Sequence, residues 1–136
     1  MFKLKDLIKI IIFPFLVYML GYSLQASWDN YQVLWWPNRL VHLLGGLSFA
    51  VVGYFVLEIF KKLKWIITTN KVVDFFIILF FVMSVSVFWE FREFLSDKYL
   101  FTHSQISVAD TVKDMFMGMV GAVLFGVGWF FKKLIQ

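Results

Sequence analysis

The chain has 136 residues, of which 61% are hydrophobic and only 16% are charged, and its mean hydropathy is +0.80. Ordinary soluble domains are about 45–50% apolar, so this composition excludes a water-soluble globular fold and predicts an integral membrane protein. The net charge of +4 does not indicate nucleic-acid binding, because the lysines lie beside long apolar runs, where anionic lipid is the nearer partner. The absence of cysteine excludes disulfide bonds and thiol nucleophiles.

Four apolar runs predict four transmembrane helices. The runs cover residues 7–24, 40–60, 72–95 and 110–131. Each has about 18 to 24 residues, which is enough for an α-helix to cross roughly 30 Å of hydrocarbon. Four such helices leave no room for a second domain. We therefore expect an all-α, integral membrane four-helix bundle that occupies residues 1–136 as a single domain.

The first apolar run also resembles a cleaved signal peptide, because it follows Lys3, Lys5 and Lys9 and ends near Ala26. Its apolar length, however, exceeds the usual signal core of about 7–15 residues. We therefore favour an uncleaved membrane anchor. The segment 25–38 that follows is rich in tryptophan and tyrosine, which predicts a loop at the membrane interface. Its aromatic residues are Trp28, Tyr31, Trp35 and Trp36.

Basic residues flank the four runs unevenly. One side carries Lys3, Lys5, Lys9, Lys61, Lys62, Lys64, Lys71, Lys132 and Lys133, and the other carries Arg39, Arg92, Lys98 and Lys113. Short loops with more lysine and arginine stay in the cytoplasm. This asymmetry predicts that the N and C termini are both cytoplasmic.

Polar residues in the last three runs recur every three or four positions, which is the spacing of one helix face. The second run aligns Arg39, His42, Gly46, Ala50 and Gly53; the third aligns Ser86, Glu90, Glu93 and Asp97; the fourth aligns Asp110, Asp114, Gly118, Ala122 and Gly126. In lipid, small residues at spacing four let helices approach closely. We expect these faces to turn towards one another, so that their polar ends converge on the outer side.

The uncharged stretches in these helices are short. Residues 75–89 would span about 22 Å as a helix, which is less than the hydrocarbon thickness, so Glu90 must lie near or inside its outer edge. Residues 115–131 would span about 26 Å, which places Asp114 at the boundary. Several carboxylates close together in a low dielectric cannot all stay ionised unaided. The cluster must hold protons, pair with basic residues or bind a cation.

Our first functional hypothesis is an outward-facing site that binds a divalent metal ion or shares protons and acts on a lipid or cell-envelope substrate. Its candidate metal ligands are His42, Glu90, Asp110 and Asp114, and its candidate catalytic carboxylates are Glu90, Glu93, Asp110 and Asp114. One imidazole with several carboxylates suits Mg²⁺, Mn²⁺, Ca²⁺ or Zn²⁺ better than copper. The identity of the metal stays open.

The second hypothesis is a non-catalytic structural or assembly protein whose acidic residues pair with arginine to form a clasp. A transporter or channel fits less well, because Glu58 and Asp74 are the polar residues near the inner edge and nothing matches the outer cluster. Membrane lipid is the expected partner in each case. A homo-oligomer or a partner membrane protein stays open.

The loop that precedes the last run carries two further residues of interest. Ser107 stands three residues before Asp110, where a serine hydroxyl caps a helix N-terminus. His103 lies in the middle of the loop, and we expect it to be a solvated residue outside the site.

Three motifs in order resemble the YjdF-like family of small bacterial inner-membrane proteins of unknown function and, more distantly, the VanZ-like family. The motifs are Arg39-Leu-Val-His42-Leu-Leu-Gly-Gly46, Phe88-Trp89-Glu90-Phe-Arg-Glu93-Phe, and Ala109-Asp110-Thr-Val-Lys-Asp114-Met115 followed by Gly121-Ala122. The resemblance implies a multi-pass protein of the bacterial inner (plasma) membrane and supplies no known reaction. Typical YjdF-like members have more spans, and the VanZ-like pattern has Gln at position 93 and Asn at position 114.

Overall fold

The computed structural model describes residues 4–27, 35–102 and 104–132, and in those residues it contains four α-helices and no β-strand. The helices are α1 (Leu4–Ser27), α2 (Trp35–Lys62), α3 (Lys71–Leu100) and α4 (Val108–Lys132). This confirms the predicted all-α bundle. The predicted interfacial residues Trp28 and Tyr31, and the loop residue His103, lie outside the described residues.

Three of the helices are long and apolar enough to cross a membrane. These segments are Trp36–Lys62, Lys71–Leu100 and Val108–Phe130. The described apolar part of α1, Ile10–Leu24, is shorter. The membrane character of the fold is therefore confirmed by three helices, while the crossing of the bilayer by α1 stays a prediction.

The helices are longer than the predicted spans, because hydropathy detects only the part inside hydrocarbon whereas the helices continue through polar turns. α3 begins after Asn70, whose side chain accepts a hydrogen bond from the Val72 backbone N–H at 2.9 Å. It ends before Phe101, which has a left-handed φ of 56°. The Ser107 hydroxyl accepts the Asp110 N–H at 3.2 Å, so the predicted cap of α4 is confirmed.

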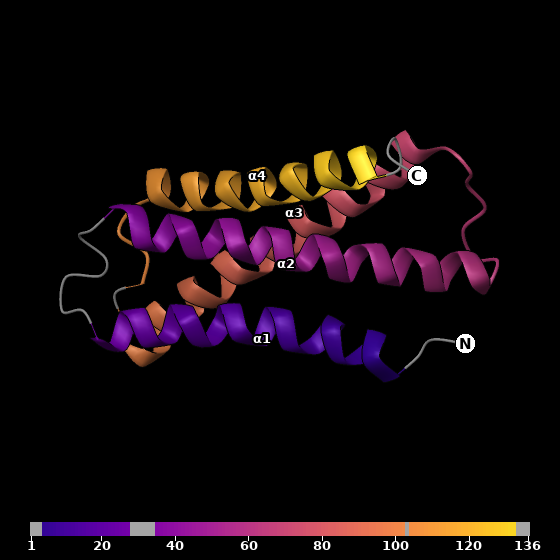
Figure 1. Cartoon of the computed structure of the whole chain (residues 1–136). Helices are drawn as coiled ribbons and strands as arrows, with labels where there is room; N and C mark the ends of the chain where they lie inside the picture. Colours follow the sequence, from indigo (N-terminus) through magenta and orange to yellow (C-terminus); the bar gives the residue numbers. More distant parts are fainter. Residues whose placement is uncertain (1–3, 28–34, 103, 133–136) are drawn as a thin grey trace.

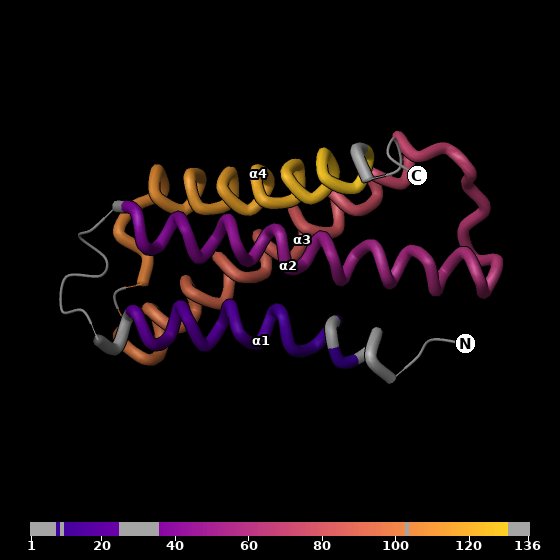
Figure 2. Tube along the Cα trace, in the orientation of Figure 1, coloured from indigo at the N-terminus to yellow at the C-terminus, as the bar shows by residue number. Residues whose placement is uncertain are grey.

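The helices run alternately up and down, with α2 at the centre (Figure 1). α2 packs against each of the other three helices, and α3 also packs against α4. α3 crosses obliquely behind α2, as the backbone trace shows (Figure 2). The α3–α4 connection marks the end of the bundle that holds His42, here called the His42 end. The α2–α3 connection marks the opposite end, here called the Lys61 end, where α1 begins and α4 finishes.

The closest helix contact is between α2 and α4, and glycines make it possible. A Cβ at Gly46 would overlap the carbonyl oxygen of Gly118, and a Cβ at Gly121 would overlap that of Leu43. By contrast, a Cβ at Gly45 would meet open space. This confirms that the small-residue faces of α2 and α4 turn towards each other, and their contact sets the spacing of the polar residues one turn away.

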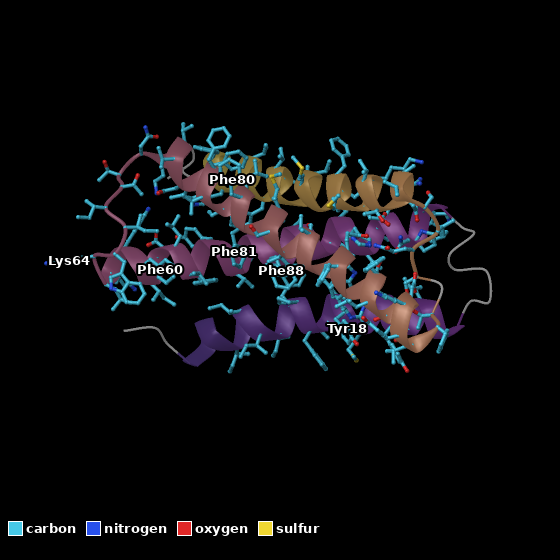
Figure 3. The ribbon with its side chains drawn as sticks, turned by 180° about the vertical axis from the view of Figure 1, so that it is seen from behind. Tyr18, Phe60, Lys64, Phe80, Phe81 and Phe88 are labelled. Atoms are coloured by element: carbon cyan, nitrogen blue, oxygen red, sulfur yellow. The ribbon has the colours of Figure 1, made fainter. Side chains whose placement is uncertain are left out.

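The apolar core is small, and most large apolar side chains point outward. The buried core comprises Ala50, Leu57, Ile78, Val82 and Ala122. Phe80 and Phe88 of α3, in contrast, are 60% and 73% exposed on the outer surface (Figure 3). A lipid solvent favours an apolar outer surface, because aromatic rings gain nothing by burial when the surroundings are themselves apolar.

An ion pair is buried near the Lys61 end. Lys61 Nζ lies 2.6 Å from Asp74 Oδ2 and 3.7 Å from Glu58 Oε1. Asp74 is 1% exposed, although its place in the sequence suggested only the edge of the membrane. The ammonium group balances the buried carboxylate and joins the last turn of α2 to the first turn of α3.

Candidate functional site

Three titratable side chains from three different helices meet at the His42 end. His42 Nδ1 lies 3.9 Å from Glu90 Oε1, and His42 Nε2 lies 3.8 Å from Asp114 Oδ2. The imidazole of α2 thus stands between a carboxylate of α3 and a carboxylate of α4. One ligand atom from each residue can be chosen so that all three lie within 4.8 Å of one another. The structure therefore brings together three of the residues that the helical spacing selected.

Both carboxylates in this group are buried and incompletely bonded. Glu90 is 5% exposed and Asp114 is 3% exposed. Glu90 Oε1 and Asp114 Oδ1 are buried oxygens that accept no hydrogen bond within the described part of the chain. Buried polar atoms in folded proteins nearly always have a partner. The two oxygens therefore have free capacity for a ligand between the helices.

The other carboxylate oxygens are held by side-chain amides. Asn38 Nδ2 donates to Asp114 Oδ2 at 2.7 Å. Gln105 Nε2 donates to the Glu90 backbone oxygen at 3.0 Å and to Glu90 Oε2 at 3.4 Å. These contacts fix the orientation of each carboxylate, as supporting residues do around metal sites. Sequence reasoning missed both amides. Asn38 stands four residues before His42 on the same helix face, so that spacing would have found it, whereas no periodic pattern points to Gln105.

Asp110, the fourth predicted metal ligand, lies beside the group of three rather than within it. Its Oδ1 is 3.7 Å from Nη2 of Arg39, and about a fifth of each side chain is exposed. Asp110 is one turn closer to the helix start than Asp114, which places it near the rim of the bundle. It therefore pairs with a cation that the chain itself supplies.

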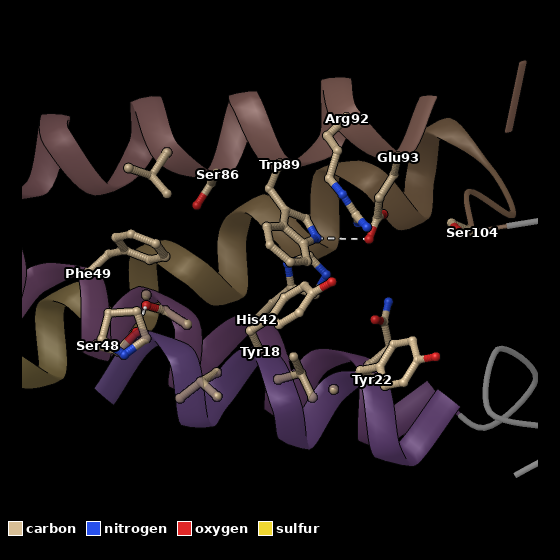
Figure 4. Close-up of a pocket in the computed structure, with 18 of the residues that line it drawn as sticks. Tyr18, Tyr22, His42, Ser48, Phe49, Ser86, Trp89, Arg92, Glu93 and Ser104 are labelled. Atoms are coloured by element: carbon tan, nitrogen blue, oxygen red, sulfur yellow. Dashed lines mark hydrogen bonds between the residues drawn. The ribbon is translucent and has the colours of Figure 1, made fainter. Parts of the chain in front are cut away.

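Glu93 and Asp97 have different surroundings, although both share the polar face of α3. Glu93 Oε1 accepts a hydrogen bond from Trp89 Nε1 at 2.8 Å and lines an adjacent cavity (Figure 4). Asp97 accepts hydrogen bonds from the backbone N–H groups of Ser104 and Gln105, each at 2.8 Å, and thereby shapes the α3–α4 connection. Asp97 thus positions Gln105 rather than joining the site.

The geometry allows a shared ion but no direct hydrogen bond. At 3.8 and 3.9 Å, the imidazole nitrogens are too far from the carboxylates to donate to them. Ligand atoms lie about 2.0–2.6 Å from a bound Zn²⁺ or Ca²⁺, so two ligands of one ion are up to about 5.2 Å apart. The observed separation of 4.8 Å or less lies within that limit.

Comparison with known proteins gives one family match. The family described as "Predicted membrane protein (DUF2238)" matches residues 1–133. No match to the chain was found among curated proteins or among solved structures. The matched description specifies membrane character and no activity, and it does not separate the YjdF-like from the VanZ-like resemblance.

Proposed function

The chain belongs to this family of membrane proteins, and we propose that it binds a divalent cation through His42, Glu90 and Asp114. The site would act on a lipid or cell-envelope substrate. The observation that supports this most strongly is that two buried carboxylates from different helices flank one imidazole. Glu90 Oε1 lies 3.9 Å from His42 Nδ1 and Asp114 Oδ2 lies 3.8 Å from His42 Nε2, while Glu90 Oε1 and Asp114 Oδ1 accept no hydrogen bond within the described residues. A divalent cation would balance the two carboxylates, and it would satisfy both oxygens at once.

The donor set narrows the class of cation. One nitrogen and two carboxylate ligands suit Zn²⁺ and Mn²⁺, and Mg²⁺ also accepts carboxylates. Three protein ligands leave a coordination position for water or substrate, as in catalytic zinc sites. A cation held there would polarise a phosphoryl or carbonyl oxygen or activate a water molecule.

The remaining polar residues have roles that follow from their places. His42 touches both the buried carboxylates and the cavity, so it connects the cation group to any bound substrate. Glu93 and Asp110 also line the cavity, where a carboxylate can accept or donate a proton. In this proposal His42, Glu90 and Asp114 hold the cation, while Glu93 and Asp110 act on the substrate side.

We also propose that the His42 end faces the outside of a bacterial inner membrane. The supporting observation is the excess of lysine near the opposite end, because basic segments remain in the cytoplasm. α1 begins and α4 finishes at that opposite end (Figure 1), which is compatible with two cytoplasmic termini. The YjdF-like resemblance of the three motifs belongs to this proposal and favours the same compartment.

A non-catalytic clasp is the second candidate. The Arg39–Asp110 pair at 3.7 Å and the Asn38–Asp114 hydrogen bond at 2.7 Å favour it, since each joins α2 to α4. In this reading the polar cluster fixes the bundle, and its outer faces bind a second copy or a partner membrane protein. Such a clasp needs no cation.

The test is a titration of the purified protein with Mn²⁺ and Zn²⁺, together with metal analysis after chelation and reloading. We expect one ion per chain, and we expect Glu90→Gln and Asp114→Asn to lose it while the helical content stays unchanged. Glu58→Gln, which removes a carboxylate charge at the Lys61 end, is the charge-matched control, and it should retain the ion. If the wild type binds no ion and Asp114→Asn is destabilised, the clasp is the correct account.

A further inference from the structure

A cavity with a volume of about 600 Å³ lies between α1, α2 and α3. This is within the range of about 300–1,000 Å³ that ligand sites occupy. Along α2 its wall runs from Asn38 to Phe49, which is about 16 Å at the helical rise. That length is close to half of the roughly 30 Å hydrocarbon thickness. The cavity therefore has the depth of one membrane leaflet.

The lining of the cavity changes from polar to apolar along its length. Charged side chains gather at the His42 end, and the deeper part is mostly apolar, with Ser48 and Ser86 as its polar members. The polar group contains Asn38, His42, Arg92, Glu93 and Asp110, and the apolar group contains Pro14, Phe15, Val17, Phe49, Val82 and Val85. A ligand that matches this lining has a polar head and an apolar tail.

The cavity has a side that faces the membrane. In the described residues the backbone of α1 packs closely on α2 alone, so α1 and α3 are separate walls. Between them the rings of Tyr18 and Trp89 meet edge to face, with centroids 6.1 Å apart (Figure 4). Phe15 and Tyr22 beside this contact are more than half exposed. A chain of a membrane lipid can enter sideways between α1 and α3 if the Tyr18 ring moves.

Arg92 supplies a cationic group at the polar end of the cavity, which Glu93 and Asp110 also line. Its guanidinium lies over the Trp89 ring, 5.0 Å from the centroid. Within the described residues Arg92 has no carboxylate within 4.0 Å, although it interacts electrostatically with Glu93, whereas Arg39 is paired with Asp110. A guanidinium recognises phosphate through two parallel N–H donors. Arg92 is therefore placed to bind an anionic head group.

We infer that the substrate of this site is a membrane lipid with a phosphate head group, held by Arg92, with its acyl or isoprenoid chain in the α1–α3 cavity. The inference rests on the proposed function, because the Glu90 and Asp114 carboxylates would repel an anion unless a cation balances them. With the cation present, both Arg92 and the cation would attract the phosphate. The apolar wall excludes a free phosphate as the preferred ligand, since burial of the chain supplies much of the affinity.

The experiment measures lipid binding to the Mn²⁺-loaded protein in maltoside micelles by calorimetry. The probes are dioctanoyl phosphatidic acid, dioctanoylglycerol, which has the same chains without the phosphate, and inorganic phosphate. Val85→Phe narrows the cavity, and Val87→Phe is its control, because Val87 is 55% exposed on the outer face of α3. Arg92→Gln removes the head-group cation, and Lys98→Gln is its control near the end of the same helix.

We expect phosphatidic acid to bind at least about tenfold more tightly than the other two probes, since one charge-assisted contact is worth about that factor. Val85→Phe and Arg92→Gln should each weaken this binding about tenfold, and both controls should match the wild type. Equal binding to Val85→Phe and Val87→Phe, or equal affinity for inorganic phosphate, would overturn the inference. If Val85→Phe fails to fold, Arg92→Gln still tests whether the phosphate head group binds at this site.

Manganese binding measured without lipid separates the two claims. If manganese binds to the wild type and no phosphate lipid is preferred, the substrate inference fails while the proposed cation site stands. If manganese does not bind, the proposed function fails, and the inference that rests on it fails too.

Discussion

The two ends of the bundle both bury carboxylates, but they neutralise them differently. At the Lys61 end, Asp74 Oδ2 has an ammonium nitrogen at 2.6 Å, while Asp74 Oδ1 is buried and accepts no hydrogen bond within the described residues. At the His42 end, Glu90 and Asp114 face an imidazole at 3.9 and 3.8 Å, and each keeps a buried oxygen without a partner. The charge of Asp74 is balanced by the Lys61 ammonium group, which is already cationic. The His42 end has two carboxylates around one side chain whose charge is not permanent.

This difference separates a structural ion pair from a site. The charge of a buried carboxylate that contacts lysine is balanced by the chain itself, and removing the lysine harms stability. Two buried carboxylates that share an imidazole need a proton or a metal ion from outside. The Lys61 end should therefore govern stability, and the His42 end should govern ligand binding.

The largest expected effect comes from breaking the pair at the Lys61 end. Lys61→Met leaves Asp74 as an uncompensated buried charge, which costs about 3–5 kcal/mol of unfolding free energy. The measurement is the free energy of unfolding in mixed micelles. Lys64→Met, at an exposed lysine of the same end, should have little effect.

The double variant Lys61→Met with Asp74→Leu sharpens the same comparison. Replacing both charges with apolar groups should restore most of the lost stability, because the pair itself contributes little net free energy. Manganese affinity should stay at the wild-type value in the double variant. A loss of manganese binding there would mean that the two ends are coupled, contrary to this account.

The next effect is stabilisation by the ion at the His42 end. At a manganese concentration of about 100 times its Kd, binding should add about 2.7 kcal/mol to the wild-type unfolding free energy. Asp114→Asn removes a ligand and should lose this increment, without being less stable than the metal-free wild type. Chelation should return the wild type to its metal-free stability. A stabilisation that persists in Asp114→Asn would place the ion elsewhere.

A smaller effect should follow from separating α2 and α4 without changing any charge. Gly46→Ala introduces a Cβ that overlaps the Gly118 carbonyl oxygen, so it should cost about 1–3 kcal/mol and weaken manganese binding by moving His42 away from Asp114. Gly45→Ala is the matched control, because a Cβ there meets open space. It should leave manganese binding unchanged and raise stability slightly.

The smallest effects compare one asparagine from each end. Asn38→Ala removes the hydrogen bond to Asp114 and should weaken manganese affinity by about tenfold. Asn70→Ala removes the cap of α3 and should cost about 1 kcal/mol of stability while leaving manganese affinity unchanged. Calorimetry measures the manganese affinity of each variant, and unfolding measures its stability. Equal losses of affinity would mean that Asn38 has no special role.

The helical spacing of three and four was sufficient to find His42, Glu90 and Asp114, because residues on one face of a helix must face the same neighbour. It also found the glycine contact between α2 and α4. It could not separate Asp97, which shares that face of α3 but bonds the α3–α4 connection. The position of a residue on a helix does not fix its rotamer or which loop returns to it.

The contacts that the sequence did not predict involve the segments that connect the helices. Gln105 reaches Glu90 because Asp97 accepts the backbone N–H groups of Ser104 and Gln105, and a periodic pattern carries no such information. Asp74 is buried because the turn after α2 brings Lys61 to it. Such contacts need the three-dimensional path of the connecting segments.

The most direct test of the central claim is anomalous diffraction from crystals soaked with Mn²⁺. This account predicts one strong peak about 2.0–2.6 Å from an imidazole nitrogen of His42 and from one oxygen each of Glu90 and Asp114. The peak should be absent from Asp114→Asn crystals soaked in the same way. A wild-type map without a peak between these residues, or a peak only beside Asp110 and Glu93, would contradict it.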